Sequence, residues 1–208
     1  MVFIFKEKRW YIIQNNYIFT KDKYNKVMQY LSKYLFYDAN IKYLFNEYDK
    51  FGDVYLIGGA IKDIAFFDRI PKDYDIIVLS PNKIELNLPE CFIKTHNNFG
   101  CNKIYYSDTT VIHATSDKIF NRNFIFDIWN CKDEQDIYDS SVKFNIDGLY
   151  INLSKGIYKD ELFNQSIIDG VVRIMNDKNT HPIEGRDYER GLKLANDFGL
   201  KYKWKENI

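Results

Sequence analysis

Hydrophobic residues in the first quarter of the chain follow two different spacings. After residue 19 they recur every three or four positions, which places apolar side chains on one side of a helix. This spacing predicts a helix that begins near Thr20 or Asp22 and a second one over residues 41–48. Residues 3–19 instead combine short apolar runs with a polar centre, which predicts two strands around a turn.

Beyond residue 53, short apolar runs alternate with segments of helical spacing. Strands are expected at 54–57, 73–79, 91–95, 103–106, 110–115 and 123–129. Helices are expected at 60–67, 133–141 and 184–198, with a mixed apolar stretch at 144–153. The order predicts an α+β (mixed α/β) fold with a central mixed sheet flanked by helices and a short helical C-terminal extension. We expect a catalytic head with an N-terminal extension over residues 1–150 and a short, mainly helical part over 151–208.

Composition narrows the class of protein. The 208 residues are 46% hydrophobic and 28% charged, which is enough for one sizeable core. Lys plus Arg and Asp plus Glu number 29 each, so any site for a polyanion has to be local. Three cysteines without CxxC spacing and three scattered histidines favour neither a disulfide framework nor structural zinc. With no apolar run long enough for a signal peptide or membrane span, we expect a cytoplasmic protein that does not bind membranes.

The stretch VYLIGGAIKD places two glycines between a strand and a helix. Gly58 and Gly59 have no Cβ, so the backbone can turn sharply and approach a ligand closely. The helix that follows directs free N–H groups and the positive end of its dipole at the turn, which suits a phosphate. A glycine pair after a strand is also common in plain turns.

Two aspartates open the next strand. Asp73 and Asp75 are two residues apart, so their side chains leave the same face of a sheet. Carboxylates this close repel one another unless a cation lies between them, and Mg²⁺ prefers oxygen ligands. In NFIFDIWN, the alternation puts Asp127 opposite the apolar Phe124, Phe126 and Ile128, where it would supply a third carboxylate. A solvated strand end for the pair and a surface position for Asp127 are the alternatives.

These motifs resemble those of a known enzyme superfamily. GGAIKD followed by KDYDIIV is similar to the glycine turn and Asp-x-Asp motif of polymerase-β-like nucleotidyltransferases, in the branch of CCA-adding enzymes and bacterial poly(A) polymerases. FNIDGLYINLSKGIYKD and DGVVRI resemble further elements of the same catalytic head. The resemblance implies that Gly58 and Gly59 bind a nucleoside triphosphate and that Asp73 and Asp75 bind Mg²⁺. It also places Lys62 where the family usually has arginine, so that Lys62 or Lys143 would assist the two glycines in binding the phosphates.

Two departures from the family pattern affect the nucleotide site. The family carries Arg-Arg-Asp just before FNIDGLY, whereas this chain has SVK, leaving Lys143 as a phosphate contact. The base-reading helix of CCA-adding enzymes begins Glu-Asp-x-x-Arg, and RDYER keeps only Asp187 and Arg190 of that set. Residues three apart share a helix face, so the pair would read a base edge or form a plain salt bridge.

A third departure concerns the RNA-holding part. The family continues into helical domains that grip RNA, and this sequence ends soon after the head. KEKRW near the N-terminus and KYKWKENI at the C-terminus interleave basic and aromatic residues, which fits either RNA contact or ordinary solvated ends. A second copy or a partner subunit would be another source of RNA grip.

Together, the motifs and the resemblance favour a Mg²⁺-dependent nucleotidyltransferase. It transfers NMP from an NTP, ATP or CTP, to the 3′-hydroxyl of an RNA, tRNA by resemblance, and releases pyrophosphate. Asp73, Asp75 and Asp127 are the expected metal ligands and catalytic residues. Two alternatives remain open: a stand-alone, toxin-like enzyme that modifies a protein or small molecule, and a non-catalytic nucleotide- or RNA-binding module.

Overall fold

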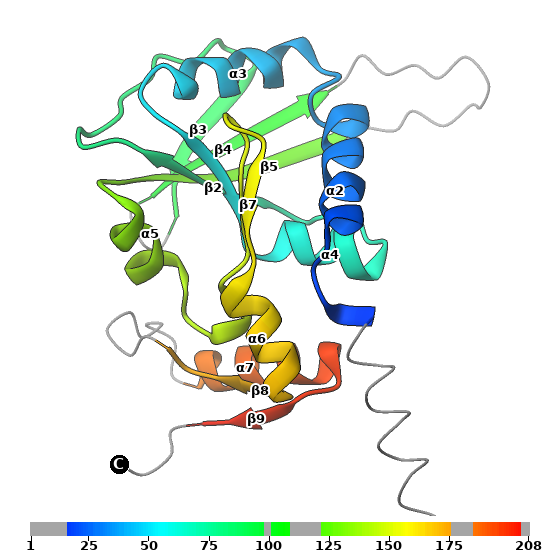
Figure 1. Ribbon diagram of the computed structural model, residues 1–208. Coiled ribbons are helices and arrows are strands. Elements are labelled where there is room, and N and C mark those ends of the chain that lie inside the picture. Colours follow the sequence, from blue (N-terminus) through cyan, green and yellow to red (C-terminus); the bar gives the residue numbers. More distant parts are fainter. Residues whose placement is uncertain (1–15, 98–100, 109–121, 176–184, 205–208) are drawn as a thin grey trace, which may run out of the picture.

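A seven-stranded mixed sheet forms the centre of the molecule in the computed structural model, in the order β3-β4-β5-β2-β1-β6-β7 (Figure 1). The structure describes residues 16–97, 101–108, 122–175 and 185–204. The mixed α/β fold expected from the sequence is confirmed. Among the helices described, none has the length and apolar character needed to cross a membrane.

The sheet combines one parallel pairing with antiparallel ones. Its strands are β1 (Val54–Ile57), β2 (Tyr74–Leu79), β3 (Phe92–His96), β4 (Asn102–Asp108), β5 (Arg122–Cys131), β6 (Tyr150–Asn152) and β7 (Ile157–Lys159). β2 and β5 run parallel at the centre, and each other neighbouring pair is antiparallel. The strand expected at 110–115 lies outside the described residues.

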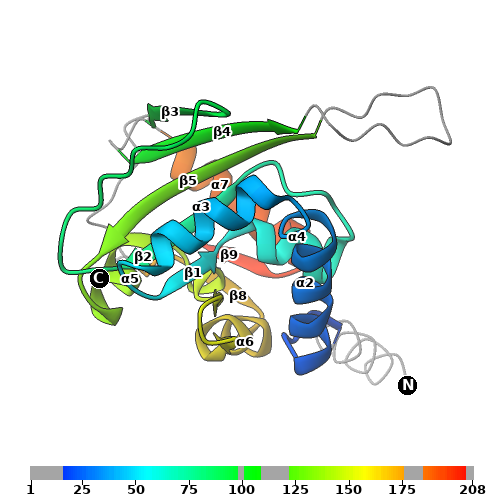
Figure 2. The same cartoon turned by 90° about the horizontal axis from the view of Figure 1, so that it is seen from above.

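Three helices cover one face of the sheet: α2 (Lys21–Tyr34), α3 (Ala39–Asp49) and α4 (Gly59–Phe67) (Figure 2). Their starts follow the capping rules, since the Thr20 hydroxyl accepts from the backbone N–H of Lys23 and the Asp38 carboxylate accepts from that of Ile41. Leu31, Leu44 and other apolar residues of these helices join the sheet in the main core. Burial of this face is the dominant stabilising term of the fold.

The N-terminal expectation needs a correction. Residues 3–15 lie outside the described part, and residues 16–19 form no strand, because Asn16 and Tyr17 are helical. The rings of Tyr17 and Phe19 pack at 6.1 and 6.2 Å from that of Phe66, so they fill the core beside α4. Short apolar runs around a polar centre are typical of strands, but here the aromatic side chains serve to fill the core, which is why the runs were misinterpreted.

The opposite face of the sheet, called the site face below because it carries Asp75 and Asp127, is covered differently. Helix α5 (Glu134–Ser141), capped by Asp133, packs against one end of the site face through Ile137. A small second core forms there with Tyr55 and Ile77. At the other end of the site face the side chains are exposed. Asp75 and Asp127 lie between this exposed end and the end that α5 covers.

The C-terminal part lies below the sheet in the view of Figure 1. It consists of the 3-10 helix η1 (Asn145–Asp147), α6 (Glu161–Asp169), β8 (Val171–Arg173), α7 (Arg186–Phe198) and β9 (Lys201–Lys203). β8 and β9 form a separate parallel pair. The expected boundary at residue 150 falls inside β6, which pairs with β1, so we propose that the head ends after β7.

Candidate active site

The turn between β1 and α4 brings a backbone and a carboxylate together. Gly58 has φ 70° and ψ −134°, a conformation that side-chain-bearing residues rarely adopt. A Cβ built on Gly58 would meet Asp75 Oδ2 at 3.0 Å, so the Asp75 carboxylate lies directly against this turn. No side chain caps the helix that begins at Gly59, so its first N–H groups are available to a ligand.

Replacing Gly58 with alanine is expected to destabilise the protein by about 1–3 kcal/mol, because the backbone there is strained for any residue with a Cβ. The added methyl group would also press on the Asp75 carboxylate, and any weakening of ligand binding at this turn would show in the same variant. Gly59→Ala is the matched control for stability, since a Cβ at Gly59 would meet nothing within 4 Å. Thermal melts and NTP titrations of both variants test this; equal stability of the two would contradict it.

The sheet places Asp75 and Asp127 side by side. They are direct partners in the parallel β2–β5 ladder, while Asp73 is the residue immediately before β2. Burial and, to a smaller extent, the negative charges of Asp73 and Asp127 raise the pKa of Asp75 to about 7, against the opposing charge of Arg190. The parallel register thus brings Asp127 to the face that carries Asp75, whereas the metal-binding and catalytic roles of both residues stay a prediction.

Asp127 has a cationic partner that the sequence did not indicate. Lys103 on β4 is its direct neighbour in the β4–β5 ladder, and Lys103 Nζ lies 3.2 Å from Asp127 Oδ2. The Asn97 side-chain amide donates to Asp127 Oδ1 at 3.4 Å. Partial burial lowers the pKa of Lys103, but the hydrogen bond and charge of Asp127 outweigh it and the net shift is upward. Lys103 thus keeps its positive charge beside the Asp127 carboxylate.

The donor set fits the magnesium ion expected from the sequence. No three His, Cys, Asp or Glu side chains within the described residues converge into a ready-made metal cluster. The chemistry of the pair nonetheless suits a hard cation, because Asp75 and Asp127 offer carboxylate oxygens and their mutual repulsion raises the pKa of Asp75. A bound divalent cation would relieve this repulsion.

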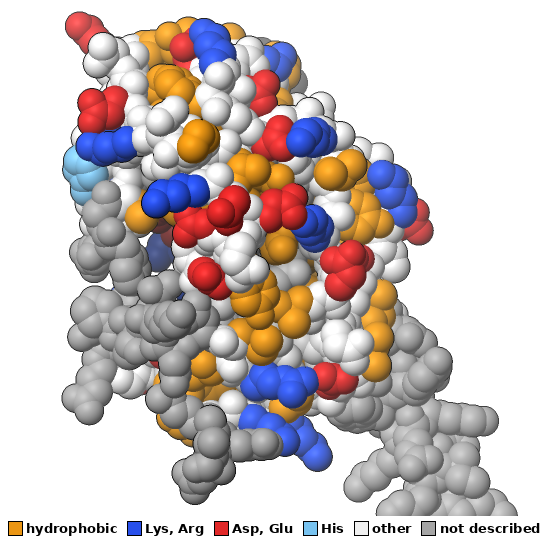
Figure 3. All heavy atoms as spheres, turned by 60° about the vertical axis from the view of Figure 1, so that its left-hand side comes forward, with side chains coloured by type: hydrophobic (Ala, Val, Ile, Leu, Met, Phe, Trp, Pro, Cys, Tyr) orange, Lys and Arg blue, Asp and Glu red, His pale blue; other side chains and the backbone are white. Residues whose placement is uncertain are grey.

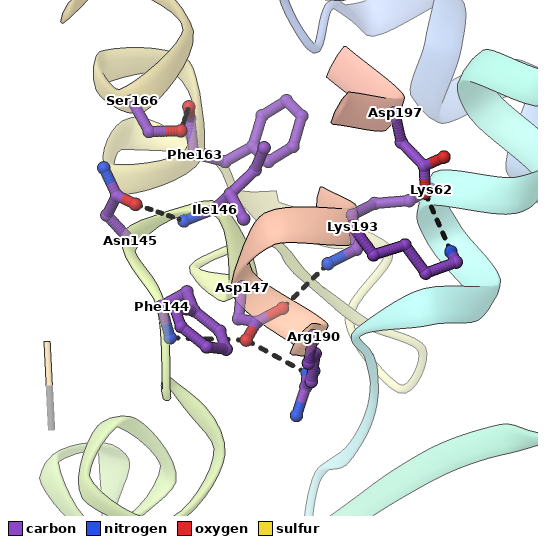
Figure 4. Close-up of polar contacts among 10 residues, drawn as sticks. All are labelled: Lys62, Phe144, Asn145, Ile146, Asp147, Phe163, Ser166, Arg190, Lys193 and Asp197. Atoms are coloured by element: carbon purple, nitrogen blue, oxygen red, sulfur yellow. Dashed lines mark hydrogen bonds and ion pairs between the residues drawn. The ribbon is translucent and has the colours of Figure 1, made fainter. Parts of the chain in front are cut away.

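A buried ion-pair network lies next to these carboxylates, and its centre was not predicted. Asp147 of η1, 4% exposed, pairs with Lys62 of α4 at 2.8 Å and with Arg190 of α7 at 3.0 Å (Figure 4). Burial raises the pKa of Asp147, but Arg190 and Lys62 outweigh it and the net shift is downward. The one available signal was an aspartate inside the apolar run FNIDGLYIN.

This ion-pair network changes the interpretation of several residues that the sequence led us to expect at a nucleotide. The Lys62 ammonium is buried against Asp147, and Lys143 pairs with Asp187 at 3.0 Å. Arg190 is held by Asp147 and is close enough to Asp75 for each charge to shift the pKa of the other. Asp187 and Arg190 thus each form an ion pair with a residue from another segment of the chain. Of the two, Arg190 is the one whose charge acts on the Asp75 carboxylate.

The remaining expectations are placed as follows. KEKRW, His113 and His181 lie outside the described residues, and His96 is exposed on β3. In the C-terminal segment, the Trp204 ring packs 5.5 Å from that of Tyr188 and 6.1 Å from that of Tyr202. This aromatic contact closes β9 onto α7.

Charge is unevenly distributed around the site. Figure 3 shows acidic side chains gathered across the middle of one side of the molecule, at the level of α5. That helix and its cap contribute Asp133, Glu134, Asp136 and Asp139. A polyanion is repelled at this end of the site face, so it is better accommodated at the end where Lys103 lies.

Comparison with known proteins gives structural neighbours only. No family model and no curated protein matches the chain, whereas sixteen chains of solved structures do. A CCA-adding enzyme with ATP is 20% identical, with a TM-score of 0.48, over 86% of this chain and 42% of the other. The Thermotoga maritima CCA-adding enzyme complexed with tRNA is 20% identical, with a TM-score of 0.46, over 88% and 43%. A tRNA-processing enzyme with CTP is 17% identical, with a TM-score of 0.43, over 73% and 40%.

Two of these neighbours are named as CCA-adding enzymes and the third as a tRNA-processing enzyme. The chain spans less than half the length of each of them. At these identities the likeness is one of fold, so function has to be argued from the site itself.

Proposed function

We propose that the protein is a Mg²⁺-dependent nucleotidyltransferase that transfers NMP from an NTP to the 3′-hydroxyl of an RNA. The observation that carries this is the position of Asp75, which lies against the glycine turn on one side and beside Asp127 on the other. A phosphate-binding turn and a carboxylate pair are thereby brought to one point of the sheet. Metal-assisted displacement at phosphorus needs both of these.

Each residue has a distinct task in the proposed reaction. Backbone N–H groups after Gly58 hold the triphosphate, and Asp127 lies nearest the incoming hydroxyl and accepts its proton. The hydroxyl oxygen bonds to the α-phosphorus, the bond from that phosphorus to its bridging oxygen breaks, and pyrophosphate leaves. Asp75 and Asp127 would hold Mg²⁺, which when bound would neutralise charge that develops on the phosphate oxygens.

Arg190 is proposed to contact the nucleotide. Its guanidinium is anchored at one side by Asp147, half of its side chain is exposed, and it lies within electrostatic range of Asp75. A planar group with several N–H donors, fixed on one edge, suits a phosphate or a base edge. Lys62 and Lys143 serve by keeping Asp147 and Asp187 neutralised.

The proposed acceptor is an RNA 3′ end, with tRNA first, because the motif resemblance is closest to enzymes that act there. ATP and CTP are the proposed nucleotides. Among the solved neighbours, ATP, CTP and tRNA are the named partners of CCA-adding and tRNA-processing enzymes.

Purified protein incubated with Mg²⁺, each α-labelled NTP in turn, and total RNA is expected to label a tRNA-sized band on a denaturing gel. Asp49→Asn, an exposed change at the end of α3 on the other side of the sheet, should label as well as wild type. Parallel reactions contain lysate protein and small-molecule fractions. Label in protein with none in RNA would replace the proposed acceptor, and label in no fraction would overturn the enzyme assignment.

A further inference from the structure

The site face continues past the carboxylates as a set of registered rows. Across the ladders, Asp75, Asp127 and Lys103 are successive partners, and Thr95 on β3 follows them. Two residues further along the strands, the next row consists of Ile125, Tyr105 and Ile93. Directly paired residues point to the same side, so this second row, here called the aromatic platform, shares the site face.

The aromatic platform exposes apolar surface beside the site. Ile93 is 64% exposed and Tyr105 is 37% exposed, whereas Tyr106 and Phe124 on the other face of these strands are buried. Helix α5 covers only the far end of the site face, around Ile77. An exposed apolar row with a polar row at its side is typical of a surface that binds a partner.

Lys103 connects the platform with the carboxylates. Its ammonium lies 3.2 Å from Asp127 Oδ2 and 6.0 Å from the centre of the Tyr105 ring. Neighbouring strands are about 4.8 Å apart and two residues along a strand span about 6.8 Å. The Tyr105 ring, the Lys103 cation and the Asp127 carboxylate therefore lie within a single nucleotide's reach of one another.

We propose that the aromatic platform binds the terminal nucleotide of a single-stranded acceptor, a site that deepens and rests on the proposed function. The base stacks on Tyr105 beside Ile93, the phosphate pairs with Lys103, and the 3′-hydroxyl reaches Asp127. A ring, a cation and a hydroxyl-binding carboxylate in this order match the base, phosphate and sugar of one nucleotide. The acidic α5 repels a phosphate backbone from the opposite end, which leaves the platform as the approach for RNA.

Tyr105→Ala is expected to raise KM for a single-stranded RNA acceptor about tenfold or more, and to leave KM for the NTP unchanged. Tyr105→Phe keeps the ring and should behave as wild type. Tyr37→Ala removes a tyrosine that is 79% exposed between α2 and α3, and it serves as the matched control. Because Tyr105 is itself more than one-third exposed, we expect the alanine variant to fold, which a thermal melt checks.

Binding is measured separately from catalysis, by fluorescence anisotropy of a labelled single-stranded RNA dodecamer without NTP. Weaker binding by Tyr105→Ala than by Tyr105→Phe and Tyr37→Ala supports the platform. Equal binding and equal acceptor KM for all three, while wild type labels RNA, overturn the platform and leave the proposed function intact. If wild type labels only protein, the proposed RNA acceptor fails first, and the platform as an RNA site falls with it.

Discussion

Replacing Asp75 with asparagine is expected to abolish nucleotide transfer and, at the same time, to stabilise the folded protein. Asparagine keeps the shape of the side chain but removes the charge that binds a cation, so activity should fall by at least about a hundredfold. The same charge is costly in the metal-free fold, because Asp75 is partly buried and crowded by Asp73 and Asp127. Its removal should raise the free energy of unfolding by about 1–3 kcal/mol at neutral pH, after allowance for solvent screening.

The gain in stability has a defined pH dependence. The folded-state pKa of Asp75 is about 7, above its ordinary value of 3.8, so the folded protein binds more protons than the unfolded chain between these values. Wild-type stability therefore declines as pH rises from about 4 to about 7, and the advantage of Asp75→Asn grows over that window and is constant above it. Urea titrations in EDTA at pH 4, 6 and 8 measure this, with Asp49→Asn as control. An advantage independent of pH would contradict the crowding of Asp75.

Asp147→Ala is expected to destabilise the protein by about 3–5 kcal/mol. The change leaves the Lys62 side chain, 6% exposed, without its anionic partner, and it frees Arg190 of α7 from its contact with η1. Urea denaturation measures the loss as a lower midpoint. Where the variant still folds, KM for the NTP should rise as well, because Arg190 is no longer held beside the carboxylates.

A matched control comes from an exposed ion pair. Glu85→Ala breaks the Lys83–Glu85 pair, whose side chains are 81% and 73% exposed, and should leave the midpoint of urea denaturation nearly unchanged, because solvent screens this pair. In the double variant Lys62→Met/Asp147→Leu, the loss should be smaller than the sum of the single changes, because the unpaired buried ammonium is gone too. A loss for Asp147→Ala as small as that for Glu85→Ala would show that Asp147 is not the centre of the network.

The sequence predicted those parts of the site whose signal is local. A glycine pair after an apolar run and aspartates at two-residue spacing carry their meaning within about twenty residues, and Gly58 and Asp75 were found in contact. The alternation around Asp127 predicted its face, although nothing local indicated which strand would lie beside it. The parallel pairing of β2 and β5 decided that.

Contacts between distant segments were not predictable in this way. Lys62 and Asp147 are 85 residues apart, and the ion pair between them exists only because α4 and η1 meet below the sheet. Read alone, Lys62, three residues after the glycine pair, looked like a phosphate ligand. Lys103 was missed for the same reason, since only the β4–β5 register brings it to Asp127.

The short C-terminal strands were missed for a different reason. β7, β8 and β9 have three residues each, too few for an alternating pattern to be visible. Their place is set by pairing, β7 with β6 and β8 with β9. The parallel pairing of β8 with β9 ties the end of α7 to the segment that follows α6.

The labelling reaction run in parallel with α-labelled and γ-labelled NTP tests the central claim most directly. Transfer of NMP predicts that the α-label enters the acceptor, that the γ-label appears only in pyrophosphate, and that Asp75→Asn loses both signals. Label from the γ-position in the acceptor would show phosphoryl transfer instead. Neither label in any acceptor, and no pyrophosphate released, would contradict a nucleotidyltransferase site at Asp75.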